Sequence, residues 1–307
     1  MPDVGSVHTD AILSNVSEMY RNAKYVGLEM LPVVSVKKES DKYYKYNSKA
    51  DRFRVPNNLR APKSDSKTID WKVTTDTYSC NEYALNDLID DREKNNADKP
   101  LNLKVDTVEF LTDVNALAQE KRVVDLLTDE NIMTNYTALT STDQWSDAAN
   151  SDPVGDIEAG KEAIHGKIFR YPNTLLLGIE VYNKLKLHPD IIDLFKYVQK
   201  GIITTEMLAD LFGVEKVIIG AAGYNSANEG ATASYGYLWG KNAILAYVES
   251  KPGLKKFSLG YTFKVGKNRT RTARIETKHS DWYEVSQIQD EEIVSVDCGY
   301  LIQTAIA

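Results

Sequence analysis

The chain has 307 residues, of which 42% are hydrophobic and 26% charged, a composition that is typical of a folded globular protein and excludes an intrinsically disordered one. Its net charge of −7 argues against a protein built to grip nucleic acid, because such proteins need a concentrated basic surface. The sequence contains no membrane-spanning apolar run and no signal peptide, and Cys80 and Cys298 are expected to be reduced thiols.

The N-terminal segment is predicted to contain a helix and then extended backbone. Apolar positions at helical spacing predict a helix from about residue 10 to residue 23. Residues 31–36 are predicted to be extended, because Pro32 disfavours a helix before it and has no N–H group to donate to a strand ladder.

Residues 37–77 combine lysines, aromatic residues and prolines without helical periodicity. Two strand-like runs, 42–47 and 68–74, predict a long two-stranded arm with an irregular tip. Such a ribbon is marginally stable alone in water, so its aromatic side chains need a surface to pack on. We expect the arm to lie on a neighbouring subunit, and the alternative is a hairpin folded back on its own domain. The candidate intersubunit contacts are Tyr43, Tyr44, Tyr46 and Phe53.

The strongest predicted helix spans about residues 107–127, after a polar linker at residues 90–100. Asp106 and Glu109 have the spacing of a capping box at its start. An apolar stripe recurs at helical spacing through Val108, Leu111, Val114, Leu117, Val124 and Leu127. The polar residues expected to lie away from most of this stripe are Asp113, Gln119, Glu120, Lys121 and Asp125.

From residue 152 onward, helices and strands alternate, and the chain ends in a β-rich segment. Asp152 and Pro153 predict one helix start, and Thr204 predicts the start of another helix that stops at Gly213. Further helices are predicted at 180–187 and 190–198, and strands at 174–178, 216–220, 237–240 and 243–248. Residues 257–307 are predicted to be almost wholly β, with 271–278 and 291–305 as the clearest runs, so the predicted fold class is α+β.

The sequence provides no catalytic, cofactor-binding or metal motif. Its four histidines lack metal-ligand spacing, and neither a Cys-x-x-Cys pair nor a nucleophile elbow occurs. His188 and Asp190 have the types of a base and its orienting acid, but no nucleophile accompanies them in the sequence, and a helix break with Asp190 as the cap is the alternative. Residues 236–242 lack the spacing and the final hydroxyl of a phosphate loop. We therefore predict a non-enzymatic protein without cofactors.

The densest basic run extends from Lys264 to Arg274. Three interpretations are open for it: a contact with DNA, a solvated turn between two strands, or a charged subunit interface. The acidic balance of the chain does not favour a strong grip on DNA.

A set of stretches resembles, in family order, the major capsid proteins of tailed bacteriophages. Each stretch is weak alone, and their order makes the set specific. They are residues 31–36, 38–46, 145–157, 172–178, 188–191, 208–214, 238–248, 260–263 and 294–300.

The resemblance implies the Hong Kong 97-like capsid fold. Its parts would be an N-terminal arm at 1–37, an extended β-hairpin called the E-loop at 38–78, a peripheral domain at 79–170 with the spine helix at about 107–127, an axial domain at 171–266, and closing strands of the peripheral domain at 267–307.

The same resemblance implies a structural protein that assembles into pentamers and hexamers of an icosahedral shell around phage double-stranded DNA, without sequence-specific binding. Assembly is expected in the host bacterial cytoplasm, with no membrane involved. The expected partners are other copies of the chain, a separate scaffolding protein, a portal and decoration proteins. The nearest alternative is the shell protein of an encapsulin-type cellular nanocompartment, which shares the fold.

Overall fold

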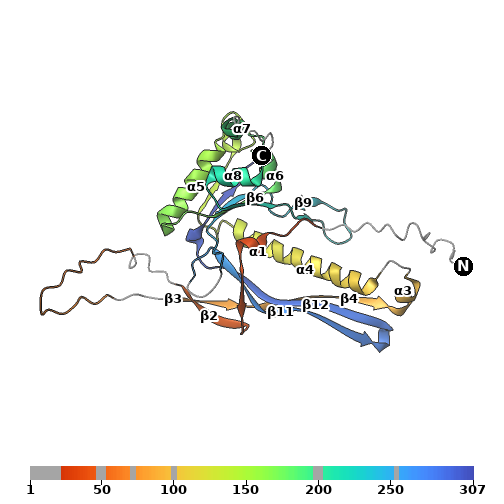
Figure 1. Cartoon of the computed structure of the whole chain (residues 1–307). Helices are drawn as coiled ribbons and strands as arrows, with labels where there is room; N and C mark the ends of the chain where they lie inside the picture. The colour runs from red at the N-terminus through yellow and green to blue at the C-terminus, as the bar shows by residue number, and fades with distance from the viewer. Residues whose placement is uncertain (1–21, 46–52, 70–73, 98–101, 196–202, 252–255) are drawn as a thin grey trace.

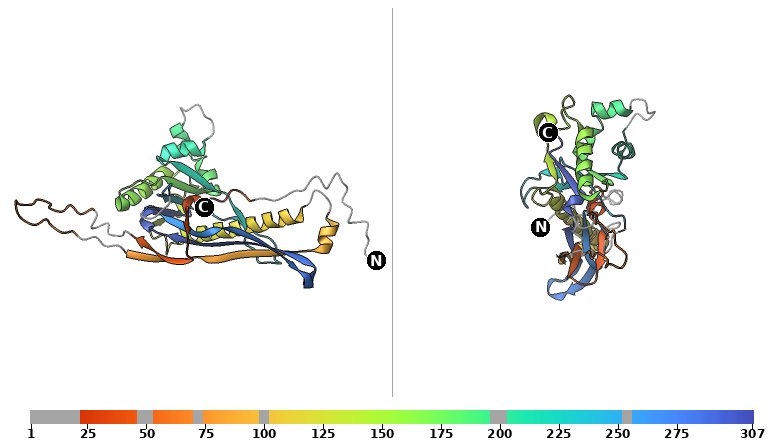
Figure 2. Two further views of the ribbon diagram at one scale, coloured as in Figure 1. Left: turned by 60° about the horizontal axis from the view of Figure 1, so that its bottom comes forward. Right: turned by 90° about the vertical axis from the view of Figure 1, so that its left-hand side faces the viewer.

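The computed structural model describes residues 22–45, 53–69, 74–97, 102–195, 203–251 and 256–307. An elongated lower part contains the long helix α4 and the longest strands, and an upper part contains four shorter helices (Figure 1). Residues 53–69 project from one side of the lower part. Seen from that side, the molecule is narrow, because α4 and the long strands run nearly along the line of sight (Figure 2).

A four-stranded sheet in the order β1-β11-β12-β4 forms the lower part. It comprises β1 (Val33–Val36), β11 (Gly260–Ile275), β12 (Ser280–Ile293) and β4 (Asn81–Asp90). β1 pairs with β11 in parallel, and the other pairs are antiparallel. The register of β11 shifts between Val265 and Arg269, where Gly266 has a φ of 68°, a backbone conformation that suits glycine.

Helix α4 (Leu103–Thr128) packs along this sheet, which confirms the predicted long helix. The Asn115 side-chain amide donates to Val285 O at 3.1 Å, and Arg122 forms two hydrogen bonds of 3.0 Å with the Glu291 carboxylate. Gln119 and Glu120, which were expected to lie away from most of the apolar stripe, are both buried. Their burial arises because the helix is covered on more than one side, so polar positions also meet protein.

The Glu120 carboxylate joins three parts of the chain. Its two oxygens accept the backbone N–H groups of Val26 and Gly27 at 2.9 and 2.7 Å, and one oxygen also accepts the Trp239 indole N–H at 2.8 Å. Val26 and Gly27 are at the start of α1 (Gly27–Met30), just before β1. The N-terminal segment is thereby fixed to α4 beside the upper part.

The upper part is a five-stranded sheet, covered by helices, in the order β5-β13-β10-β6-β7. Its strands are β5 (Tyr136–Ala138), β13 (Gly299–Gln303), β10 (Ala243–Ala246), β6 (Thr174–Gly178) and β7 (Lys216–Gly220). Its helices are α5 (Pro153–Ile168), α6 (Ile179–Leu185), α7 (Pro189–Phe195) and α8 (Thr205–Phe212). The chain's last strand, β13, therefore belongs to this sheet, whereas β12 belongs to the lower one.

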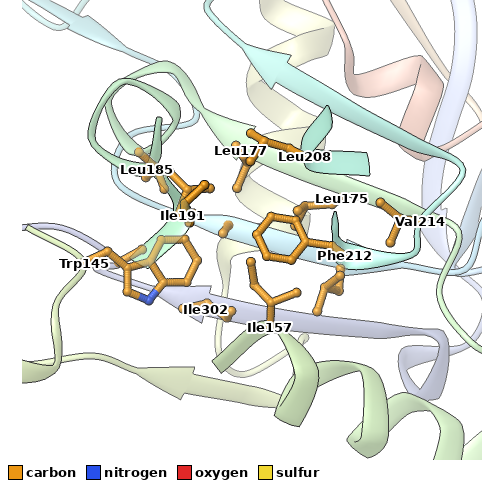
Figure 3. Close-up of a cluster of buried hydrophobic side chains, with 14 of the residues drawn as sticks. Trp145, Ile157, Leu175, Leu177, Leu185, Ile191, Leu208, Phe212, Val214 and Ile302 are labelled. Atoms are coloured by element: carbon orange, nitrogen blue, oxygen red, sulfur yellow. The ribbon is translucent and has the colours of Figure 1, made fainter. Parts of the chain in front are cut away.

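The core of the upper part lies between this sheet and its helices. Phe212 from α8 points toward Ile157 of α5 and Leu175 of β6, and Trp145 and Ile191 close one end (Figure 3). The predicted helix signals are confirmed: Asp152 accepts the Gly155 N–H at 2.8 Å, Thr204 accepts the Met207 N–H, and Gly213 ends α8 with a φ of 61°.

Several predicted boundaries of helices and strands differ from those in the structure. The supposed linker at 90–100 contains helix α3 (Asp91–Asn96), and the capping box joins Asp90 with Glu93 instead of Asp106 with Glu109. Of the strand predicted at 68–74, residues 70–73 lie outside the described residues, and the described strand is β3 (Thr74–Ser79), which pairs with β2 (Ser40–Lys45).

Two more predicted strands are shorter than expected, because turns interrupt the apolar runs that predicted them. The run at 237–240 contains only the end of β9 (Tyr235–Tyr237), which forms a hairpin with β8 (Gly223–Asn225). The run at 291–305 is broken by a 3-10 turn, Val296–Cys298. Two other such turns are Ser141–Asp143 and Glu276–Lys278. The helix predicted at 10–23 falls almost wholly outside the described residues.

Candidate intersubunit surfaces

The root of the β2–β3 arm is packed against the lower sheet. The Tyr43 ring lies 5.4 Å from that of Phe263, and the Tyr78 ring stacks on Phe263 at 4.6 Å. Burial is the main cause that raises the pKa of Tyr43, and the nearby Asp76 carboxylate adds to it. Tyr43 is only 7% exposed, so most of its side chain is covered within its own subunit. Tyr43 therefore packs on its own domain, as the alternative interpretation of the arm predicted.

The other three candidate contacts occupy different positions. Tyr44 lies in β2, opposite Thr75, and Tyr46 lies outside the described residues. Phe53 is 56% exposed, and its ring meets the Phe169 ring edge-on at 4.6 Å. The structure thus places Phe53 against the end of α5, whereas Tyr43 packs on the lower sheet. A contact between a neighbouring subunit and any of the four residues remains a prediction.

The described part of the arm beyond its root, residues 53–69, contains no regular secondary structure. Val55 is 92% exposed and Leu59 is 89% exposed, values close to those of an unfolded chain. A local turn orders part of it, since the Arg60 side chain donates to Ser64 O at 2.6 Å. The segment also carries Arg54, Arg60, Lys63 and Lys67 against a single acidic residue, Asp65. Sequence reasoning missed Val55 and Leu59, because two separate apolar residues in a proline-rich segment give no periodic signal.

His188 and Asp190, for which the sequence offered no nucleophile, have Ser151 beside them in the structure. His188 Nε2 lies 3.1 Å from Ser151 Oγ, and His188 Nδ1 lies 3.7 Å from Asp190 Oδ2. The Ser151 hydroxyl donates to Asp147 O at 2.6 Å, so its contact with His188 requires Nε2 to be the donor. The imidazole therefore cannot take the serine proton in this arrangement. His188 instead links the start of α5 to α7, where Asp190 lies in the first turn and is not the cap.

The described residues contain no group of three histidine, cysteine or carboxylate side chains arranged to hold a metal ion. A hollow of about 430 Å³ lies beside α3 and the start of α4. Its lining is Asp87, Leu88, Ile89, Glu93, Asn96, Ala97, Leu103 and Thr107. Within the described part of the chain, no helix is both long and apolar enough to span a bilayer.

The basic run from Lys264 to Arg274 lies within the single strand β11, so the interpretation as a turn between two strands is wrong. Arg271 pairs with Glu284 at 3.3 Å, and Arg274 pairs with Asp91 at 2.5 Å and with Asp281 at 3.1 Å. These ion pairs join β11 to β12 and to α3, and they neutralise two of the charges that a DNA contact would use. The two charges therefore have an internal role at the far end of the lower sheet.

The family model and the curated relatives that match this chain name the same kind of protein. A family model described as phage major capsid protein E matches residues 112–260. The major capsid protein of Burkholderia phage BcepMu is 34% identical over 301 residues, which is 95% of each chain. The major capsid protein of Pseudomonas phage JBD67 is 27% identical over 306 residues, or 97% of each chain.

Solved structures show the same likeness. The crystal structure of a phage-related protein from Bordetella bronchiseptica RB50 matches with a TM-score of 0.74 and 28% identity, over 96% of this chain and 97% of that one. The capsid of cyanophage P-SCSP1u matches with a TM-score of 0.65 and 10% identity, over 94% and 90%. An encapsulin from Synechococcus elongatus shares the fold at 9% identity and a TM-score of 0.55, over 97% and 95%.

Proposed function

This chain belongs to the phage major capsid proteins and is a structural shell protein, and we propose that its copies form both pentamers and hexamers of an icosahedral shell around double-stranded DNA. A closed ring from one kind of subunit requires one surface to meet a different surface on the next copy. Pentamers and hexamers differ in the angle between neighbours, so some intersubunit contacts must tolerate a change of angle. Contacts made by an extended segment suit that requirement.

The parts of the fold take their roles in this proposal from the Hong Kong 97-like architecture. Helix α4 is the spine helix, the four-stranded sheet is the core of the peripheral domain, and the five-stranded sheet with α5 to α8 is the axial domain. This assignment moves β5, α5 and β13 out of the peripheral ranges 79–170 and 267–307 expected from the sequence, because these elements belong with the five-stranded sheet. Residues 38–78 are the E-loop, with β2 and β3 as its root. The phage relatives, at much higher sequence identity than the encapsulin, favour the phage shell over the cellular nanocompartment.

The observation that carries the proposal is the exposure of the E-loop beyond its root. Val55 and Leu59 project from a segment without regular structure, and burying both on a neighbour would contribute about 1.5–3 kcal/mol for each side chain. The basic charge of residues 53–69 gives this segment a preference for an acidic surface, which a chain with a net charge of −7 can offer on another copy. The shell would thus be held by repeated moderate contacts between copies.

The remaining parts of the proposed function follow from the role of a shell that encloses DNA. The protein is proposed to have no enzymatic activity. It is also proposed to enclose DNA without sequence-specific binding, and the internal ion pairs of Arg271 and Arg274 in β11 support this second part. Assembly in the host cytoplasm with a separate scaffolding protein, a portal and decoration proteins completes the proposal.

Electron microscopy of particles purified from cells that express the chain with its phage neighbours tests this function, together with analysis of the particle contents. We expect icosahedral shells with fivefold and sixfold rings and, when the packaging proteins are present, double-stranded DNA inside. Uniform small shells filled with a host enzyme would instead identify a nanocompartment. A discrete oligomer without shells would contradict both.

A further inference from the structure

The β8–β9 hairpin presents an aromatic surface to solvent. Tyr235 is 85% exposed and Tyr237 is 46% exposed, and residues two apart on a strand share one face. They stand opposite Asn225 and Gly223, which offer little apolar cover. The other face of the hairpin bears Tyr224, which packs toward the core. We call the surface made by Tyr235 and Tyr237 the hairpin face.

The hairpin face is held in place although a two-stranded hairpin is weak by itself. The Asn22 side chain binds the outer edge of β8, donating to Gly223 O at 2.7 Å and accepting from Gly223 N at 2.9 Å. The Asn225 side chain accepts the N–H groups of Ala227 and Ser234 and so orders the loop between the strands. A fixed aromatic surface loses little side-chain freedom when it binds.

A second aromatic surface lies at the end of α5. Phe53, Phe169 and Tyr171 are each more than half exposed, and we call them the α5 aromatic cluster. The Tyr171 ring stacks on His165 at 4.4 Å, and Phe53 meets Phe169 edge-on. Phe169 ends α5 with a φ of 56°, a conformation that usually belongs to glycine and costs a larger residue on the order of 1 kcal/mol. A cost of this kind at an exposed side chain points to a role for the side chain itself.

The two surfaces lie on opposite sides of the axial domain, since α5 and β9 are separated across the five-stranded sheet (Figure 1). They also have complementary charge. Exposed Arg54 and Arg170 adjoin the α5 aromatic cluster in sequence, whereas Glu229 is the one charged residue of the sequence from 221 to 237. Arg170 already lies over the Tyr247 ring of its own subunit and donates to its hydroxyl at 2.7 Å, which is the kind of contact that arginine makes with tyrosine. One subunit therefore has two different, matching surfaces, as a ring contact between identical subunits requires.

We propose that the hairpin face of one subunit docks on the α5 aromatic cluster of the next copy in the same ring. This inference rests on the proposed shell function, and it assigns a contact that is separate from the tip of the E-loop. Tyr235 and Tyr237 are the anchors on one side, and Phe169 and Tyr171 are the anchors on the other. Phe53, at the start of the exposed E-loop segment, ties that segment to the same contact.

Cysteine cross-linking of assembled shells tests the proposal. The double variant Tyr171→Cys/Tyr235→Cys carries one thiol in each surface, and the native Cys80 and Cys298 are buried. A short bismaleimide should join each subunit to two neighbours, so a denaturing gel should show a ladder from dimer up to a complete ring. The matched control is Phe110→Cys/Tyr235→Cys, which moves one thiol to an exposed site on α4 and should give no ladder.

Shells that form normally but give no ladder, or an equal ladder from the control, would overturn this contact and leave the shell function standing. Wild-type protein that forms no shells would instead contradict the proposed function. A second pair of variants covers the case in which the cysteine variants do not assemble. Tyr235→Phe/Tyr237→Phe should assemble, and Tyr235→Ser/Tyr237→Ser should remain a folded subunit that does not. Assembly of both pairs, or of neither, would contradict the proposal.

Discussion

The Glu120 carboxylate accepts the indole N–H of Trp239 at 2.8 Å, although the two residues are 119 positions apart. The same carboxylate accepts the backbone N–H groups of Val26 and Gly27, so one buried side chain joins the N-terminal segment, helix α4 and the upper part. Gly27 fits because a Cβ atom there would lie 2.8 Å from Glu120 Oε2. The relative placement of three segments thus depends on one side chain.

Replacing Glu120 with glutamine is therefore expected to destabilise the subunit. Glutamine keeps one oxygen but turns an NH₂ group toward donors that then lack an acceptor, and each buried unsatisfied group costs about 1–3 kcal/mol. Urea unfolding of the purified subunit should show a lower free energy of unfolding. The matched control, Glu162→Gln on the exposed side of α5, should change it by less than about 0.5 kcal/mol. Equal stability of the two variants would show that the three hydrogen bonds contribute little.

Glu120 also shows where sequence reasoning succeeds and where it stops. Apolar residues at helical spacing located α4 and α5, and the cap residues Thr204 and Gly213 located α8. The helical spacing set Glu120 apart from most of the apolar stripe and gave no sign of its burial, because a pattern of apolar residues cannot reveal a buried carboxylate whose partners are backbone N–H groups far away in the chain. The pairing of β13 with β10 in the upper sheet also joins distant parts of the chain, so a local sequence pattern cannot reveal it.

For the candidate surfaces too, the sequence indicated some features and missed others. The unusual composition of residues 37–77 indicated the arm, and the arm exists as β2, β3 and the segment between them. Its aromatic content did not reveal which rings are covered. Tyr43 is buried by Phe263, which is 220 residues later in the chain, and no local signal reports such a contact. Phe169 and Tyr171 gave no signal either, because two aromatics after a helix look like ordinary core residues.

The ion pairs of Arg274 give the lower sheet a pH dependence of defined sign. The guanidinium lowers the pKa of the Asp91 carboxyl, and Lys94 together with Arg274 lowers the pKa of the Asp281 carboxyl. A carboxyl whose pKa is lower in the folded state stabilises the protein above its unfolded value, about 4 for aspartate, and loses that effect as the pH falls through the folded value.

Arg274→Ala should therefore lower the melting temperature at pH 7, and the difference from the wild type should shrink as the pH falls below about 4. Thermal unfolding across this range measures the change. Arg92→Ala, which removes an exposed charge from α3, is the control and should show little change at either pH. A difference for Arg274→Ala that is constant with pH would exclude the ion pairs as its source.

The two thiols are expected to be unreactive in the folded subunit. Burial raises the pKa of Cys80 to about 11 and that of Cys298 to about 12, so the reactive thiolate is scarce at pH 8. Iodoacetamide should modify neither thiol in native protein and both in urea, as measured by intact-protein mass. Rapid modification of the native subunit would mean that the surrounding strands open readily, and the cross-linking experiment would then need cysteine-free protein.

The E-loop variant Val55→Ser/Leu59→Ser separates folding from assembly. Both side chains are almost fully exposed in the subunit, so their replacement should alter the free energy of unfolding by less than about 0.5 kcal/mol. If they are buried on a neighbour in the shell, the lost apolar contact should raise the subunit concentration needed for assembly by on the order of tenfold or more. Light scattering during assembly and electron microscopy of the products measure this concentration.

Leu187→Ser is the matched control, because Leu187 is also exposed but lies between α6 and α7, away from the E-loop. It should leave the assembly threshold close to that of the wild type. If the two variants shift the threshold equally, general surface polarity governs assembly and the E-loop tip has no special contact. A shift confined to Val55→Ser/Leu59→Ser would instead mean that the exposed tip is stabilised by a neighbour, since no folded contact within its own subunit covers these two side chains among the residues that the structure describes.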